Sequence, residues 1–221
     1  MTLDELIKAF RIRANDKIEP FLWSDEEVTS FLNDAQKEAA IRGRLIYDTA
    51  DTISLHKDVA VYSISKFLYE ISEANYNGND GIEGRSLILR TPEEMRLEHG
   101  DNWKSKVGTP RYIAISGGYC RVAPIPEKAG SLDLEGYRLP IAFDLSQKET
   151  SEPEIAEPHH SYLVYWALNL AFSIPDSEVF DPQRAQLAER EFTQYFGLRP
   201  DSDLRAETSL NLPHVVKGFW P

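Results

Sequence analysis

The stretch from Ser24 to Asp48 constrains the fold most, because its apolar residues repeat with the period of a helix. Ser24 and Glu27 form the sequence pattern of a capping box, which marks the start of a helix. At 1.5 Å per residue this helix would be about 35 Å long. Its apolar stripe needs a partner from elsewhere in the chain, and it consists of Val28, Phe31, Leu32, Ala35, Ala39 and Ile46.

Three further segments have helical periodicity. A short helix is expected over residues 2–14, where Thr2 and Glu5 form a second capping box. A third helix is expected between Pro158 and Pro175, and a fourth from Asp181 to Gly197, with a cap and a first-turn proline at its start. We expect the early long helix and the two late helices to pack their apolar stripes together.

The middle of the chain has the pattern of β-strands. Residues 53–55 and 59–61 flank a polar turn and predict a hairpin, and residues 68–76 predict a strand with residues 86–90 as its neighbour. Gly117 and Gly118 predict a tight hairpin in which Ile115 faces Cys120. A short helix is expected from Thr91 to Gly100, and Gly136 is expected to form a bulge.

These patterns predict an α+β fold. Residues 1–48 and 157–197 would form a helical bundle domain, residues 49–143 an inserted and mainly antiparallel β domain, residues 144–156 a linker, and residues 198–221 an extended C-terminal arm. The arm ends in apolar and aromatic residues, which either fold back on their own domain or dock on another protein. The residues expected to bind a partner are His214, Val215, Val216, Phe219 and Trp220.

The charge of the chain limits its partners. With 24 basic and 36 acidic residues the formal net charge is -12, which argues against general attraction to nucleic-acid phosphates. The sequence has no run of about 18 apolar residues and no secretion signal, so we expect no membrane contact. The single cysteine, Cys120, has no internal disulfide partner, and we expect it to be a buried residue in a protein folded in a reducing compartment.

No catalytic constellation is recognisable in the sequence. The acidic pairs Glu93–Glu94 and Glu152–Glu154 could in principle hydrolyse a glycoside, but pairs are expected by chance among 36 acidic residues. His159 and His160 lack further ligands at metal spacing, and the glycine-rich loop matches no nucleotide or calcium motif. We therefore expect no enzyme activity, cofactor or metal. That loop is instead expected to be exposed, and includes Asn77, Gly78, Asn79, Asp80 and Gly81.

The order of these segments resembles a known family. The resemblance covers residues 21–199 and includes WSDEEVTSFLNDAQKEAAIRGRLIYD, ISLHKDVAVYSI, TPRYIAI, YCRVAPIPEKAGSLDLEGYRLP and the stretch from PEIAEPHHSYLVYW to EFTQYFG. It is similar to the head–tail adaptor proteins of tailed bacteriophages, and most to adaptors of the tail tubular protein A type.

The resemblance implies a structural virion protein in the neck between head and tail. It implies a ring, commonly of twelve copies, between the portal protein and the tail, with DNA passing through without specific binding. The arm would then anchor the portal or a neighbouring subunit, and the loop at residues 77–81 would contact the tail or the channel. Other readings are a different neck or tail-completion protein, a hydrolase with paired carboxylates, and an acidic regulatory module.

Overall fold

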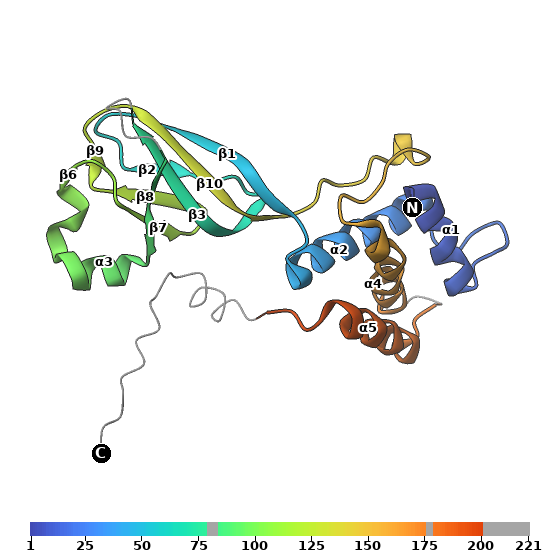
Figure 1. Ribbon diagram of the computed structural model, residues 1–221. Helices are drawn as coiled ribbons and strands as arrows, with labels where there is room; N and C mark the ends of the chain where they lie inside the picture. The colour runs from blue at the N-terminus through green and yellow to red at the C-terminus, as the bar shows by residue number, and fades with distance from the viewer. Residues whose placement is uncertain (79–83, 176–178, 201–221) are drawn as a thin grey trace, which may run out of the picture. The chain divides into compact units, whose positions relative to one another are not determined.

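The computed structural model describes residues 1–78, 84–175 and 179–200. The fold is α+β, as predicted, with helices and mainly antiparallel strand pairs. The chain divides into two compact units (Figure 1): a helical unit of residues 1–46 and 138–200, and a β unit that includes residues 47–137. The chain therefore leaves the helical unit after Ile46 and returns to it at Arg138.

The helical unit is formed by segments from both ends of the chain, and its helix starts match the predictions. The side chains of Thr2 and Ser24 accept hydrogen bonds from the backbone N–H groups of Glu5 and Glu27, which completes both capping boxes. Asp181 caps the last helix. The elements are α1 (Leu3–Ala14), α2 (Asp25–Gly43), η2 (Leu145–Gln147), η3 (Glu157–His159), α4 (His160–Phe172) and α5 (Pro182–Phe196).

Helix α4 is the central element of this unit. It contacts α1, α2 and α5, and residues from all four helices share one apolar core. Trp23 lies edge-on to both Phe10 and Phe172, at ring-centroid distances of 5.5 and 5.6 Å. Edge-to-face pairs of this kind add to the free energy gained from burial. The early and late parts of the chain are thus joined through aromatic packing.

Helix α2 ends earlier than the sequence pattern predicts. It stops at Gly43 instead of Asp48, because Arg44 adopts a left-handed conformation with φ of 50° and closes the helix. Ile46 is still buried in the helical core, but from a position beyond the helix. At 19 residues, α2 is about 28 Å long.

The segment at residues 144–156, expected as a surface linker, is hydrogen-bonded to the helical unit. The backbone N–H groups of Leu3 and Asp4 donate to the carbonyl oxygens of Ser151 and Lys148, at 2.7 and 3.0 Å. Ile155 in this segment is buried in the helical core. Because the first turn of a helix has N–H groups without partners inside the helix, these bonds also complete α1.

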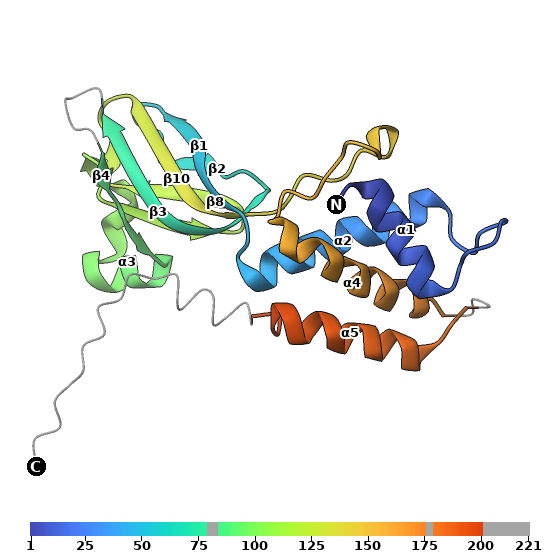
Figure 2. The same cartoon turned by 45° about the vertical axis from the view of Figure 1, so that its right-hand side comes forward.

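The β unit contains two four-stranded sheets (Figure 2). Sheet A has the strand order β1-β10-β3-β4 and sheet B the order β2-β8-β7-β5, while β6 pairs with β9. Their inner sides share an apolar core that includes Leu55, Ile113 and Leu132. The elements are β1 (Tyr47–Leu55), β2 (Val61–Ser63), β3 (Leu68–Gly78), β4 (Arg85–Ser86), β5 (Ile88–Arg90), α3 (Pro92–His99), η1 (Asp101–Ser105), β6 (Val107–Gly108), β7 (Tyr112–Ser116), β8 (Tyr119–Ala123), β9 (Ile125–Pro126) and β10 (Gly130–Arg138).

The predicted hairpin at Gly117 and Gly118 is confirmed. Strands β7 and β8 pair antiparallel, with Ile115 opposite Cys120 and Ile113 opposite Val122. Both glycines have positive φ, which the tight turn requires. Cys120 is buried, as expected, and burial raises the pKa of its thiol to about 11.

Other strand pairings differ from the prediction. Strands β1 and β2 do not form a hairpin, because β1 pairs with β10 in sheet A and β2 with β8 in sheet B. Residues 86–90 were predicted to form one strand beside β3. They belong instead to two strands: β4 pairs with β3, and β5 pairs with β7 in sheet B. Chains that cross between two stacked sheets place consecutive strands in different layers, which a single strand's pattern does not reveal.

The bulge predicted at Gly136 lies instead in β1, between Asp48 and Asp51. Gly136 has a different role: a Cβ atom at this position would overlap the carbonyl oxygen of Glu70 and lie 2.9 Å from the Cα of Ile71. The glycine therefore allows β10 to approach the backbone of β3 closely.

Candidate interaction surfaces

Most residues predicted to bind partners lie outside the described residues. These are Asn79, Asp80, Gly81, His214, Val215, Val216, Phe219 and Trp220. Asn77 and Gly78 are described, and they lie at the end of strand β3 instead of in a loop. The Asn77 side chain donates to Asp133 at 2.6 Å and accepts from the backbone N–H of Gly84, also at 2.6 Å. Asn77 therefore joins both ends of the connection between β3 and β4.

The start of the C-terminal segment is fixed by Arg42 on α2. Its guanidinium donates to the Thr193 hydroxyl at 2.8 Å and to the Gly197 carbonyl at 3.0 Å. The same group forms an ion pair with Glu38 at 2.8 Å, and Arg199 pairs with the other oxygen of Glu38 at 3.4 Å. Two arginines and one buried carboxylate thus hold the end of α5 and the residues that follow it.

The loop between α1 and α2 is held by a second buried arginine. Arg11 donates to Asp16 at 2.8 Å, to the Trp23 carbonyl at 3.1 Å and to Asp25 at 2.6 Å. The loop presents Ile18, which is 82% exposed, next to this fixed frame. The bonds of Arg11 thus fix residues on both sides of this exposed position.

Four of the residues considered for catalysis, Glu94, Glu154, His159 and His160, bond to neighbouring groups of the protein. Glu94 completes the capping box of α3 with Thr91, and Glu154 pairs with Arg138 through both carboxylate oxygens at 2.9 and 3.0 Å. His159 contacts the Tyr195 hydroxyl at 3.1 Å, and His160 bonds the Ile155 carbonyl at 2.8 Å. The two histidines therefore point to different partners, as their adjacent positions predict.

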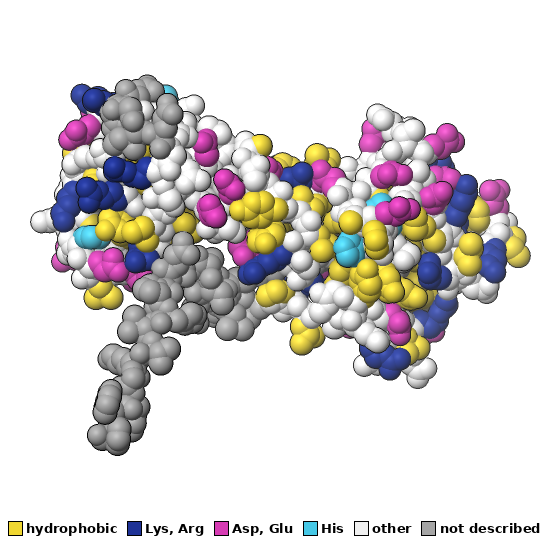
Figure 3. All heavy atoms as spheres, viewed as in Figure 1, with side chains coloured by type: hydrophobic (Ala, Val, Ile, Leu, Met, Phe, Trp, Pro, Cys, Tyr) yellow, Lys and Arg dark blue, Asp and Glu magenta, His cyan; other side chains and the backbone are white. Residues whose placement is uncertain are grey.

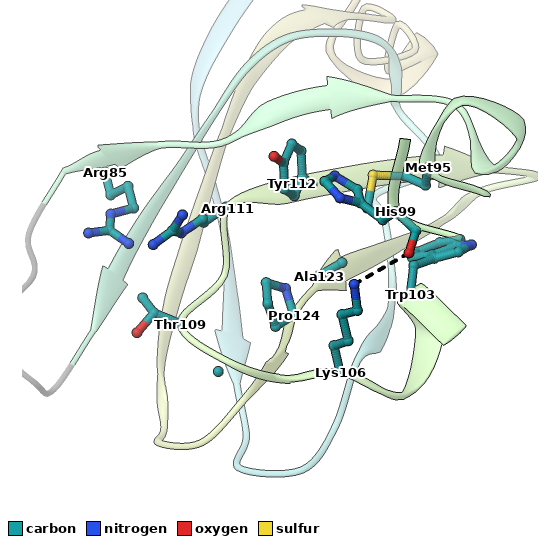
Figure 4. A pocket seen from close by; sticks show the side chains of 11 residues that line it. Arg85, Met95, His99, Trp103, Lys106, Thr109, Arg111, Tyr112, Ala123 and Pro124 are labelled. Carbon is teal, nitrogen blue, oxygen red and sulfur yellow. Dashed lines mark hydrogen bonds between the residues drawn. The ribbon is translucent and has the colours of Figure 1, made fainter. Parts of the chain in front are cut away.

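A pocket of about 440 Å³ in the β unit gathers basic side chains (Figure 4). Arg85 comes from β4, Lys106 from the segment before β6 and Arg111 from the segment before β7. Figure 4 shows Arg85 and Arg111 at one side of the pocket and Met95, His99 and Trp103 at the other. The remaining lining residues are Gly108, Thr109, Tyr112, Ala123 and Pro124. We call this site the basic pocket.

The chemistry of the basic pocket favours an anion. No acidic residue is part of its lining, and neither Arg85 nor Arg111 has an ion-pair partner within the described residues. The Lys106 ammonium donates to an uncharged group, the backbone carbonyl of His99, at 3.3 Å. Guanidinium groups bind carboxylates and phosphates through paired hydrogen bonds. The His99 ring lies 4.7 Å from the Tyr112 ring, which adds an aromatic wall.

The sequence marks this pocket by a local pattern of charge and not by a binding motif. Between residues 102 and 126 there are four basic residues and no acidic one, in a chain with a net charge of -12. Lys104 and Arg121 from this segment line a neighbouring pocket of about 320 Å³, which shares Trp103 with the basic pocket. Figure 3 shows dark blue side chains gathered over this end of the β unit.

Three strands of sheet A, β1, β3 and β10 as far as Tyr137, have the opposite charge. Residues 47–55, 68–78 and 130–137 contain six acidic and no basic residues. Leu132 and Leu134 face the core, so Asp133 and Glu135 lie on the outer side of β10. Burial, followed by the carboxylates of Glu135 and Glu73, raises the pKa of Tyr47 on the adjacent strand. We call the outer side of sheet A, with Glu73, Asp133 and Glu135, the acidic face.

The comparison with known families identifies the chain. A family model described as SU10 adaptor protein matches residues 1–214. The chain belongs to the SU10 adaptor family. A search of curated proteins found no match to it. As a member of this family it is a bacteriophage head–tail adaptor, a structural virion protein of the neck that contacts head and tail components. The resemblance inferred from the sequence is thus confirmed.

The described residues of the adaptor contain neither a metal-binding cluster nor a membrane-spanning helix. Among them, no group of three or more His, Cys, Asp or Glu side chains is placed to hold a metal ion. Across the same residues, none of the helices combines the length and apolar character needed to cross a membrane.

Proposed function

We propose that this adaptor forms a ring, of twelve copies, that joins the portal vertex to the tail and surrounds the path of the DNA. The observation that carries the proposal is the family match over residues 1–214. A ring of identical copies matches the rotational symmetry that phage necks need to connect two ring-shaped partners end to end. The net charge of -12 supports passage of DNA without tight binding, because an acidic wall repels phosphates.

In this proposal the two units have separate tasks. The helical bundle domain, residues 1–48 and 157–197, would provide the rigid frame of each subunit, and the inserted β domain, residues 49–143, would add contact surface. The buried aromatic packing of α4 with α1, α2 and α5 supports a rigid frame. Residues 144–156 would connect the two domains, held by their bonds to the start of α1.

The C-terminal arm, residues 198–221, would anchor the adaptor to the portal or to a neighbouring subunit. The contacts of Arg42 with Thr193 and Gly197 support this, because they fix the point from which the arm starts. The terminal residues Val215, Val216, Phe219 and Trp220 have the apolar and aromatic character of binding anchors. An extended segment of this kind can also bind by adding a strand to a sheet edge.

Deleting residues 210–221 tests the arm. The truncated adaptor should keep its helical circular-dichroism spectrum and melting temperature but lose binding to purified portal protein in a sedimentation assay. A matched control replaces the same residues with a Gly/Ser segment of equal length, which keeps the chain length but removes the anchors. Normal portal binding by either variant would contradict the proposal for the arm.

The connection at residues 77–81 would contact the tail or the channel wall. The support for this role is Asn77, whose side chain bonds both Asp133 and Gly84, at the two ends of the connection. Replacing residues 79–83 with two glycines should impair tail attachment to DNA-filled heads while ring formation remains intact. Full tail attachment in infectivity and electron-microscopy assays would argue against this role.

The ring itself is tested by mixing the purified adaptor with portal protein. Native mass spectrometry should detect a closed complex with a fixed number of adaptor copies, expected to be twelve, and electron microscopy should show a central opening. A complex with one or two adaptor copies per portal would contradict the ring. Binding to purified tail tube but never to portal would favour a tail-completion protein instead.

A further inference from the structure

The basic pocket and the acidic face lie on the same compact unit, and their charges are complementary. The pocket has Arg85, Lys106 and Arg111 with no acid in its lining, and the acidic face has Glu73, Asp133 and Glu135 on strands that contain no basic residue up to Tyr137. Each surface therefore has an uncompensated charge within the described residues. Like charges gathered this way raise the free energy of the free subunit unless an oppositely charged group approaches.

We propose that the basic pocket of one adaptor subunit receives the acidic face of a neighbouring copy of the same chain. This inference rests on the proposed ring and assigns the surfaces that build it. The surfaces are different patches, so the contact is head-to-tail: each copy offers its pocket to one neighbour and its sheet to the other. Contacts of this type close into rings when the rotation between copies allows it.

The pocket has the size and groups for carboxylate side chains. Its volume of about 440 Å³ is enough for two or three side chains from an apposed sheet. Arg85 lies directly opposite Tyr76 in the pairing of β3 with β4. Side chains of residues that lie opposite each other project from the same side of a sheet, and Tyr76 is buried in the core. Arg85 therefore projects from the core side of sheet A. Arg111 is exposed at the opening. Paired guanidinium bonds to carboxylates would fix the register between neighbours.

On the acidic face the three carboxylates are not equivalent. Asp133 accepts hydrogen bonds from Thr52 at 2.8 Å and from Asn77 at 2.6 Å, so it also supports the sheet. Glu73 is exposed, and the Glu135 carboxylate accepts one weak hydrogen bond, from the Tyr47 hydroxyl at 3.5 Å. Glu73 and Glu135 are therefore the better targets for charge reversal, because their substitution leaves the internal bonds of sheet A in place.

The decisive experiment uses two charge-reversed adaptors and their mixture. The pocket variant is Arg85→Glu with Arg111→Glu, and the face variant is Glu73→Lys with Glu135→Lys. Each alone should weaken assembly with portal protein by about tenfold or more, because like charges then meet at every contact. An equal mixture should restore assembly, because reversed pockets match reversed faces and native faces match native pockets in an alternating ring.

Restoration by the mixture excludes misfolding as the cause of each single defect. Two matched controls change the same charge elsewhere in the β unit: Lys57→Glu with Lys66→Glu, and Glu93→Lys with Glu127→Lys. All four side chains are exposed and lie outside both surfaces. The controls should assemble like the native adaptor, and raising the salt concentration should weaken native assembly by screening the contact.

Several results would overturn the inference. If the native adaptor forms rings and both reversed variants do so equally well, the ring uses other surfaces and only this inference fails. The same holds if both variants fold but their mixture does not assemble. If the pocket variant assembles normally but loses retention of duplex DNA on a filter, the pocket binds nucleic acid instead. If the native adaptor forms no ring with or without portal, the proposed function fails together with the inference.

Discussion

Replacing Arg11 with methionine should destabilise the helical unit more than any exposed substitution in α1. The Arg11 side chain is 10% exposed and forms an ion pair with Asp16, whose side chain is 2% exposed. Methionine keeps most of the apolar volume but leaves the Asp16 carboxylate buried without its countercharge. Leu22 continues to donate one backbone hydrogen bond to Asp16, at 3.0 Å, which does not replace a positive charge.

The expected loss follows from this geometry. Removing one partner of a buried ion pair typically costs about 3–5 kcal/mol, because the remaining charge stays desolvated. The Trp23 carbonyl and the Asp25 carboxylate also lose the hydrogen bonds that Arg11 donates to them. We therefore expect the loss of unfolding free energy to lie in the upper part of this range. Since domains are stable by about 5–15 kcal/mol in total, the variant should unfold at a clearly lower urea concentration.

The assay is urea unfolding followed by circular dichroism at the helical band. Arg13→Met is the matched control: it removes the same charge two residues away, where the guanidinium lies 5.2 Å from the Tyr165 ring, and should cost about 1 kcal/mol or less. Combining Arg11→Met with Asp16→Asn should recover part of the loss, because the uncompensated charge is gone. A loss below about 1 kcal/mol for Arg11→Met would refute the reasoning.

Three further predictions concern single positions. Gly136→Ala should destabilise the β unit by about 3 kcal/mol in urea unfolding, because the new methyl group meets the backbone of Glu70 and Ile71; unchanged stability would contradict this close approach. Cys120 is 1% exposed and burial raises its pKa to about 11, so a thiol reagent should modify the native adaptor at pH 8 only after urea is added, whereas prompt reaction would show that the site opens. Arg11 holds the pKa of Asp25 below its usual value, so the stabilisation by this carboxylate should be present above the usual pKa and lost as pH falls through the lowered one. Asp25→Asn should accordingly destabilise the adaptor at neutral pH, and this difference should shrink in paired unfolding curves as pH falls through the lowered pKa.

The residues of the basic pocket are far apart in the sequence and form no motif. Each of its residues is ordinary in the sequence, and Arg85 lies 26 positions before Arg111. Only the pairing of β4 with β3 in sheet A and of β5 with β7 in sheet B brings the two guanidinium groups to one cavity. The stretch at residues 102–126, which has basic residues and no acidic one, is the local feature of the sequence that indicates a basic surface.

The sequence by itself determined the features that depend on neighbouring residues. The capping boxes at Thr2 and Ser24, the start of the short helix at Thr91 and the turn at Gly117 and Gly118 are set by bonds and backbone angles within a few positions, and all match the structure. The family likeness also came from short phrases in a fixed order, and the family match confirms it.

Tertiary structure alone decided the features that join distant parts of the chain. The sheet that β2 and β5 enter and the need for a glycine at position 136 depend on strands that approach from far along the sequence. Local sequence patterns indicate which side of a helix or strand is apolar, but many different elements could pack on that side. The choice among them is made by packing and by the close approach of backbones, which exist only in the folded chain.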